Sequence, residues 1–150
     1  MSDVSSIRLR HTVTRLTVHM VWATRDRCPW LGLDIDPWLS KQVAAKGEEI
    51  GCRVIAVGNA CDHVHVLVTH PPTLAVATIA HRLKGASSRV LASQLPQGFE
   101  WQAGYFAESV SDIARAAAYV RHQRQHHDAP AAGPPEQWEA SFAHPWGAER

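Results

Sequence analysis

Two runs of β-branched and apolar residues in the middle of the chain are the feature that most constrains its fold. Residues 53–58 (RVIAVG) and 63–69 (HVHVLVT) are separated by only four residues. β-Branched side chains pack well on a pleated sheet, and a connection this short joins neighbouring antiparallel strands. The sequence therefore predicts a β-hairpin here, and the rest of the fold must be arranged around it.

Two further strands are predicted outside this hairpin. Residues 12–24 (TVTRLTVHMVWAT) are expected to form one long strand with a single buried face, because apolar side chains recur at a period of two. These side chains are Leu16, Val18, Met20 and Trp22. A fourth strand is predicted around Tyr105, within residues 98–111.

Three helices are predicted from apolar spacing and from residues that favour helix ends. They cover residues 37–50, residues 73 to about 94, and residues 112 to about 127. The expected N-cap residues are Asp36, Thr73 and Ser111. Pro37 directly follows the first of these caps, a position in which proline is favoured.

The resulting order of elements, β-α-β-β-α-β-α, is similar to a ferredoxin-like split β-α-β sheet with one helix appended, an antiparallel α+β fold. A chain of 150 residues, 45% of them hydrophobic, is sufficient for one domain with a core. We expect that domain over residues 1–127. Residues 128–150 hold four of the nine prolines and are expected to form a Pro- and Ala-rich irregular tail.

The sequence also makes a prediction about the cellular environment of the protein. The first ten residues are polar and Ser-rich, and no apolar run approaches the roughly 18 residues that cross a bilayer. We therefore expect no membrane association and a cytoplasmic location.

The second strand of the hairpin carries the first candidate for chemistry. His63 and His65 are two residues apart, so both side chains point to one face of a strand while Val64 and Val66 point to the other. Two imidazoles at this spacing can hold one metal ion. The chain has ten histidines, so this triplet also arises by chance, and two half-exposed strand histidines are the alternative interpretation.

A phenol and an amide follow on the last predicted helix. Tyr119 and Gln123 are at positions i and i+4, which places them one turn apart on the same helix face. Beside a divalent cation a phenol oxygen can attack a phosphate, and an amide oxygen is a suitable ligand for Mg²⁺ or Mn²⁺. Taken alone, Tyr119 is better explained as a helix tyrosine that packs with one edge on the sheet.

Five stretches of the sequence, in this order, point to a known family. They are TVHMVWATRDRCPWL, VGNACDHVHVLV, HRLKGASSRVL, WQAGYFAESVS and YVRHQRQHH. Together they resemble the single-tyrosine HUH transposases of small bacterial insertion sequences, which include REP-associated tyrosine transposases; HUH denotes His, a hydrophobic residue, His. The resemblance spans roughly residues 12–127 and implies an RRM-like sheet of the HUH endonuclease type. Phe106 and Glu108 depart from the small or apolar residues usual in the family.

The resemblance implies a metal-dependent transposase that cleaves and rejoins single-stranded DNA through a 5′-phosphotyrosine. His63 and His65 match the metal ligands of the family, Tyr119 matches the nucleophile, and Gln123 matches the residue that completes the metal site. The implied cofactor is Mg²⁺ or Mn²⁺. The implied partners are DNA hairpins at the ends of the element and a second copy of the chain, in a homodimer whose subunits share their active sites.

Other residues are candidates for supporting roles. Asp62 either accepts a hydrogen bond from a metal-bound imidazole of His63 or serves the turn between the strands. A formal net charge of only +1 requires any DNA surface to come from local clusters. The candidates for DNA contact, each with a solvated surface residue as its alternative, are Arg82, Lys84, Ser87, Ser88, Arg89, Arg8, Arg10, Arg15, Arg25 and Arg27.

Two other functions are compatible with the same residues. One is a domesticated or inactive relative that binds DNA hairpins, for example as a regulator, without cleaving them. The other is a metal-dependent nuclease that uses His63, His65 and Gln123 but forms no covalent bond through Tyr119.

Overall fold

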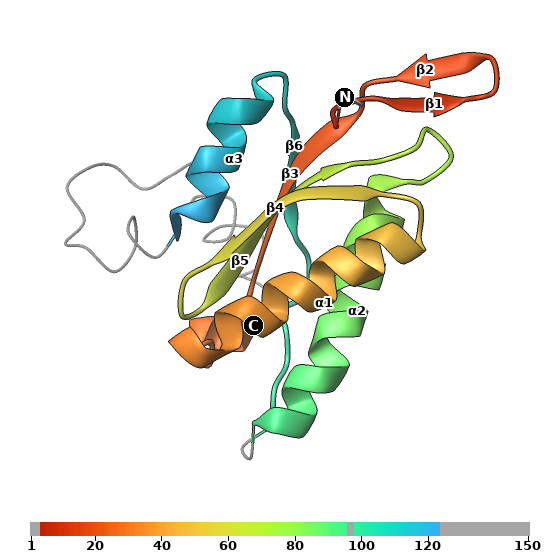
Figure 1. Cartoon of the computed structure of the whole chain (residues 1–150). Helices are drawn as coiled ribbons and strands as arrows, with labels where there is room; N and C mark the ends of the chain where they lie inside the picture. Colours follow the sequence, from red (N-terminus) through yellow and green to blue (C-terminus); the bar gives the residue numbers. More distant parts are fainter. Residues whose placement is uncertain (1–3, 96–97, 124–150) are drawn as a thin grey trace.

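The computed structural model describes residues 4–95 and 98–123 and shows an α+β fold built on a four-stranded antiparallel sheet (Figure 1). The strand order is β4-β5-β3-β6. The strands are β3 (Thr17–Ala23), β4 (Arg53–Asn59), β5 (His63–Thr69) and β6 (Phe106–Ser109). The helices are α1 (Asp36–Glu49), α2 (Val76–Gln94) and α3 (Ile113–Arg121). The predicted α+β class and the antiparallel sheet are therefore confirmed.

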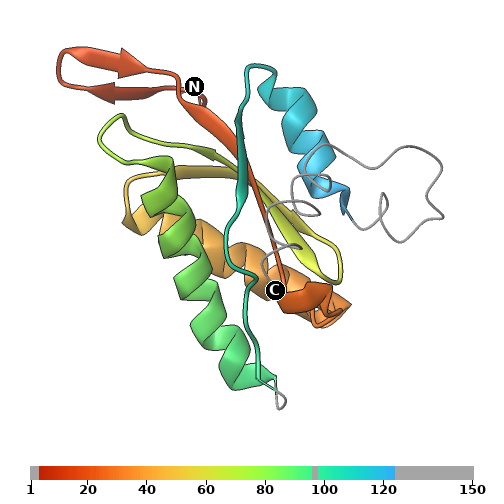
Figure 2. The ribbon, with the colours of Figure 1, turned by 180° about the vertical axis from the view of Figure 1, so that it is seen from behind.

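The helices lie on opposite faces of the sheet. Figures 1 and 2 show α1 and α2 side by side on one face and α3 on the other. All seven residues of β5 are buried, so this strand is covered on both sides. Because side chains alternate along a strand, Val64 and Val66 enter the core with α1 and α2, whereas His65 and Leu67 face α3.

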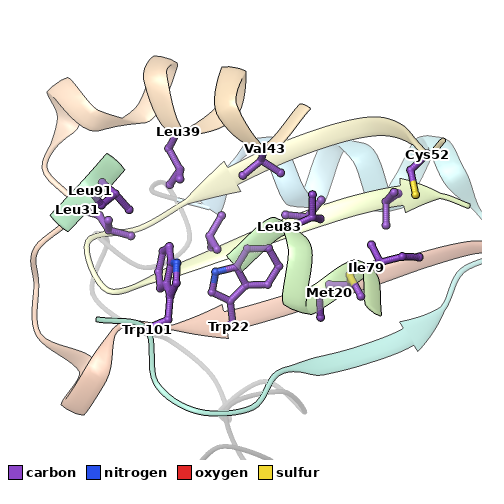
Figure 3. Close-up of a cluster of buried hydrophobic side chains, with 14 of the residues drawn as sticks. Met20, Trp22, Leu31, Leu39, Val43, Cys52, Ile79, Leu83, Leu91 and Trp101 are labelled. Atoms are coloured by element: carbon purple, nitrogen blue, oxygen red, sulfur yellow. The ribbon is translucent and has the colours of Figure 1, made fainter. Parts of the chain in front are cut away.

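The main core fills the space between the sheet and the helix pair. Met20 and Trp22 of β3 are completely buried there, as the predicted period of two requires. Leu39 of α1 and Leu83 of α2 pack in the same cluster (Figure 3). Burial of these side chains fixes the register of β3, since a slip of one residue would turn its apolar face away from the helices.

The predicted long strand over residues 12–24 is wrong in its first half. The chain forms a separate two-stranded ribbon from β1 (Ile7–Leu9) and β2 (Thr12–Thr14), and β3 starts only at Thr17. The ribbon projects away from the sheet (Figure 1). The backbone of Arg10 turns at a φ of 38°, which lets β2 pair with β1. Leu16 is partly exposed and does not join the core face.

None of the three predicted helix caps is present in the structure. Asp36 is itself the first residue of α1, and Ile35, which precedes it, provides no side-chain cap. Thr73 lies in a turn closed by a hydrogen bond from Leu74 N to Pro71 O, and α2 begins three residues later without a side-chain cap. The cap of α3 is Asp112 rather than Ser111, since the Asp112 carboxylate accepts a hydrogen bond from the Arg115 backbone N–H.

The first helix and its connection follow the prediction more closely. Helix α1 begins at Asp36, whose carboxylate accepts a hydrogen bond from the Asn59 side chain at the end of β4. Two short 3₁₀ turns, η1 (Arg25–Arg27) and η2 (Leu33–Ile35), connect β3 to α1. The described residues do not include 124–127 of the predicted last helix. They also do not include the predicted tail over 128–150. Within residues 4–95 and 98–123, no helix is long and apolar enough to cross a membrane.

A glycine on β4 sets the distance between α3 and the sheet. A Cβ atom at Gly58 would lie 1.7 Å from the backbone oxygen of Val120, far inside any van der Waals contact. Val120 itself is fully buried against Ala56 and Leu67. Only a residue without a side chain at position 58 therefore allows α3 to approach as closely as it does.

We expect Gly58→Ala to displace α3 and to lower the midpoint of thermal unfolding. Hydrogen exchange should become faster in the backbone amides of α3 while those of β3 and β5 stay protected. Gly85→Ala is the matched control: a Cβ there meets nothing within 4 Å, and alanine favours the helix by about 1 kcal/mol over glycine. Unchanged exchange of the α3 amides in Gly58→Ala would contradict the contact.

Candidate active site

The two histidines of β5 form the centre of a candidate active site beneath α3. Both are almost completely buried, and their ring centroids are 5.1 Å apart. They belong to the central part of the sheet, where β5 pairs with β4 on one side and β3 on the other. A buried polar side chain is costly unless it is hydrogen-bonded, so the partners of the two rings indicate what holds them in place.

His63 is held by the carboxylate that precedes it. Its Nδ1 lies 2.8 Å from Asp62 Oδ1, and Asp62 Oδ2 accepts a hydrogen bond from Arg27 Nε at 2.9 Å. Burial raises the pKa of Asp62, but the hydrogen bonds from His63 and Arg27 and the Arg27 charge outweigh it and lower the pKa to about 2. The ionised carboxylate therefore favours a proton on His63 Nδ1, which makes Nε2 the nitrogen that can bind a metal.

Asp62 also serves the turn, the second of the roles considered for it. Its backbone oxygen accepts hydrogen bonds from the backbone N–H and the hydroxyl of Thr24, at the end of β3. The residue thus joins the loop before His63 to the neighbouring strand.

His65 is held by another histidine, which the sequence analysis did not select. His65 Nδ1 lies 2.7 Å from His19 Nε2, and His19 Nδ1 lies 3.1 Å from Glu108 Oε1. His19 is on β3 and 5% exposed. The sequence could have indicated His19 only as a polar residue inside a strand of buried residues. Its partners could not be predicted, because they depend on the pairing of β3 with β5 and β6.

Tyr119 packs over the histidines of its own chain. Its ring centroid is 5.6 Å from that of His65 and 6.0 Å from that of His19, with the rings nearly perpendicular. Gln123, just beyond the end of α3, is completely buried, and its Nε2 donates to the Tyr119 backbone oxygen. Its Oε1 is buried without a hydrogen-bond partner in the described part of the chain.

The donor set suits a divalent cation only if the amide takes part. In residues 4–95 and 98–123, no three His, Cys, Asp or Glu side chains gather as a metal site. The imidazoles of His63 and His65 supply two nitrogen donors, and Gln123 has a buried oxygen that accepts no hydrogen bond from the described residues. Two imidazoles and one amide oxygen leave coordination positions for water and phosphate oxygens, an arrangement that Mg²⁺ or Mn²⁺ accepts.

Four of the residues predicted to contact DNA have other partners in the structure. One is Arg27, which forms an ion pair with Asp62. Ser87 is fully buried and bonds to Leu83 and Trp101 within the protein, so its prediction is wrong. Lys84 is half-buried and donates to the backbone oxygens of Gln102 and Gly104. Arg25 is exposed and forms an ion pair with Glu100.

The other predicted basic residues are on the surface. Arg82 and Arg89 are exposed on α2, where they line a groove of about 500 Å³ with Lys46 and Glu49 of α1. Ser88 lines a separate groove with Lys84 and Tyr105. A third set, exposed on or next to the β1–β2 ribbon, consists of Arg8, Arg10 and Arg15.

Comparisons with known proteins connect this geometry to one family. The family model described as IS200-like transposase matches residues 12–123, which include all of the candidate site. The chain is 28% identical to the ISDra2 transposase TnpA of Deinococcus radiodurans over 124 residues. This match covers 78% of this chain and 89% of that protein.

Solved structures show the same similarity. A protein of Deinococcus radiodurans R1 assigned as a transposase is 27% identical, with a TM-score of 0.65 over 84% of this chain and 99% of that one. A REP-associated tyrosine transposase, solved with a REP hairpin, shares the fold at a TM-score of 0.52. It is 15% identical and aligns over 80% of this chain and 68% of its own.

The environment of Lys84 gives a prediction about pH. Burial lowers its pKa from 10.5 to about 8, so between these pH values the unfolded chain binds more protons than the folded one. The contribution of Lys84 to the free energy of unfolding therefore rises with pH in this window. Denaturant titrations should show wild type gaining stability relative to Lys84→Met from pH 8 to 10.5.

Lys41→Met provides the matched comparison, because Lys41 is exposed on α1. Its stability difference from wild type should stay constant over the same pH range. A constant difference for Lys84→Met as well would contradict the assigned environment of Lys84.

Proposed function

This chain belongs to the family of IS200-like transposases, and we propose that it cleaves and rejoins single-stranded DNA through a covalent bond to Tyr119. The observation that carries the proposal is the position of the Tyr119 ring, 5.6 Å from His65 in a buried site that also contains His63. A tyrosine beside a buried imidazole that can act as a base or bind a metal is suited to attack a phosphate.

The proposed reaction conserves the phosphodiester energy. The Tyr119 oxygen attacks the phosphorus in line and the bond to the 3′ oxygen breaks. The phenolic proton is lost and the 3′ oxygen takes up a proton, which gives a 5′-phosphotyrosine and a free 3′-hydroxyl. In the reverse step a 3′-hydroxyl attacks the phosphotyrosine, releases Tyr119 and joins the strands. One phosphate ester replaces another at each step, so rejoining needs no ATP.

His63, His65 and Gln123 are the residues that would hold a divalent cation, Mg²⁺ or Mn²⁺, in this site. When bound, such a cation stabilises the charge that develops on the scissile phosphate. The support for this assignment is the donor set: two buried imidazoles with hydrogen-bonded Nδ1 atoms and one buried amide oxygen. Both rings are buried, and the chain itself keeps bulk water from the His65 ring by packing Tyr119 against it.

We assign DNA hairpins at the element ends as the substrate. The support is the family membership and the fold shared with a transposase solved on a REP hairpin. Exposed arginines on α2 and beside the β1–β2 ribbon supply local positive charge that the net charge of the whole chain conceals. The exposed candidates for phosphate contact are Arg8, Arg10, Arg15, Arg25, Arg82 and Arg89.

The proposal includes the finer fold and the assembly. In the sheet the strands are ordered β4-β5-β3-β6. Along the chain, α1 connects β3 to β4 and α2 connects β5 to β6. Together these connections support a ferredoxin-like topology of the HUH type. We also propose a homodimer in which α3 of each subunit completes the site of the other. The contact between Gly58 of β4 and Val120 of α3 joins the surface of the helix to the surface of the sheet. The same contact can therefore form when α3 comes from a second chain.

Tyr119→Phe should abolish the covalent product and leave the fold intact. The assay incubates the protein with labelled single-stranded hairpin DNA and Mg²⁺ or Mn²⁺, and detects an adduct that survives SDS. Tyr105→Phe is the matched control, because Tyr105 is the only other tyrosine in the sequence and packs against the main core cluster rather than against the histidines of β5. An adduct that persists in Tyr119→Phe would contradict the nucleophile.

The same assay separates the other candidate functions. Cleavage without an adduct in the wild type would indicate a metal-dependent nuclease. Hairpin binding without cleavage would indicate a domesticated or inactive DNA-binding relative.

Mixing two inactive variants tests whether subunits share their sites. Tyr119→Phe lacks the phenol and His63→Ala lacks one imidazole. If the helices are exchanged, a mixed dimer contains one site with both His63, from the first variant, and Tyr119, from the second. We expect an equimolar mixture to recover a fraction of wild-type cleavage, measured after subunit exchange. No recovery, with mixed dimers present by native mass spectrometry, would place each complete site within one chain.

A further inference from the structure

We propose that His19 and Glu108 form a positioning relay that fixes the tautomer and orientation of His65. This inference rests on the proposed function, in which His65 binds the cation, and it assigns roles to two residues outside that set. His19 Nε2 lies 2.7 Å from His65 Nδ1, and His19 Nδ1 lies 3.1 Å from Glu108 Oε1. The relay thus runs from β6 through β3 to β5.

Sheet register brings the three residues together. His19 is directly opposite Glu108 on β6, and it is two residues from Val21, the residue opposite His65. His19 and His65 are therefore diagonal neighbours on the same face, a separation that two long side chains can bridge. The planes of their rings differ by only 17°, with centroids 4.9 Å apart. A carboxylate on β6 is two strands away from β5, so it reaches His65 only through a side chain on β3.

The direction of the hydrogen bonds follows from the carboxylate at the end. A carboxylate accepts hydrogen bonds, so His19 Nδ1 carries the proton and donates to Glu108. A neutral imidazole has one N–H, and His19 Nε2 is consequently an acceptor. His65 Nδ1 must then donate to His19, which places the lone pair of His65 on Nε2. This is the tautomer that a metal ligand needs.

Through the relay, the Nδ1 atom of each imidazole is linked to a carboxylate. His63 Nδ1 is bound directly by the Asp62 carboxylate, whereas His65 Nδ1 is bound by a carboxylate through one intervening imidazole. Glu108 is half-exposed, so its carboxylate is kept in water at no large desolvation cost while His19 is buried.

A packing role for His19 is the competing explanation, since its ring also contacts Phe106 and Tyr119 edge-on. The two roles predict different results for His19→Phe, which keeps an aromatic ring but removes both nitrogens. His19→Gln restores an amide oxygen that can accept from His65 and an amide N–H that can donate to Glu108.

The experiment has two readouts on the full-length protein. Nitrogen-15 NMR of the imidazoles in metal-free protein reports the His65 tautomer, and calorimetric titration with Mn²⁺ reports metal affinity. We expect wild-type His65 to be protonated on Nδ1 and His19→Phe to give a mixture of tautomers. We expect the Kd for Mn²⁺ to rise about 10–100-fold in His19→Phe, and His19→Gln to recover most of this loss.

Glu108→Ala tests the far end of the relay at a half-exposed position, which keeps the test decisive if His19→Phe does not fold. It should also raise the Kd for Mn²⁺ and shift the His65 tautomer. Glu100→Ala is the matched control: it removes an exposed carboxylate that pairs with Arg25, and it should leave both readouts unchanged.

Wild-type tautomer and Mn²⁺ affinity in both His19→Phe and Glu108→Ala would overturn the relay. A wild-type protein that binds no Mn²⁺ would instead contradict the proposed metal site. The tautomer measurement would still decide the relay in that case, because it is made without metal.

Discussion

The structure depends on the alternation of side chains along β5, a strand that is buried on both faces. Its valines complete the core under α1 and α2. Its histidines point to the opposite face and are therefore buried under α3. An imidazole placed there requires hydrogen-bond partners, and Asp62 and His19 provide them. The core that determines the fold therefore also places the His65 ring beside Tyr119.

Helix α3 completes the site because a single backbone contact allows it to approach. The absence of a side chain at Gly58 brings the end of α3 against β4, and this contact sets the height of Tyr119 above His65. The same helix end buries Gln123. The positions of Tyr119 and of the Gln123 amide are thus controlled together by the docking of one helix, the element that the proposed dimer exchanges.

Local patterns were sufficient for much of this account. The β-branched runs of the hairpin and the alternation in β3 predicted the sheet and its buried face. The spacing of Tyr119 and Gln123 predicted that both lie at the same end of the last helix. Features that depend on pairing between distant segments were not predictable. The ribbon β1–β2 draws Thr12–Thr14 out of the predicted strand, and the His19 hydrogen bonds exist only once β3 lies between β5 and β6. Ser87 was misassigned because helix spacing alone does not distinguish a buried hydroxyl from an exposed one.

Identification of the residue that bears DNA tests the central claim most directly. Protein reacted with hairpin DNA and Mg²⁺ would be digested with nuclease and trypsin, and the remaining nucleotide located by mass spectrometry. The account predicts a phosphodiester-linked nucleotide on the peptide AAAYVR, residues 116–121, which contains Tyr119. A nucleotide on the peptide that contains Tyr105, or DNA cleaved with no modified peptide, would contradict it.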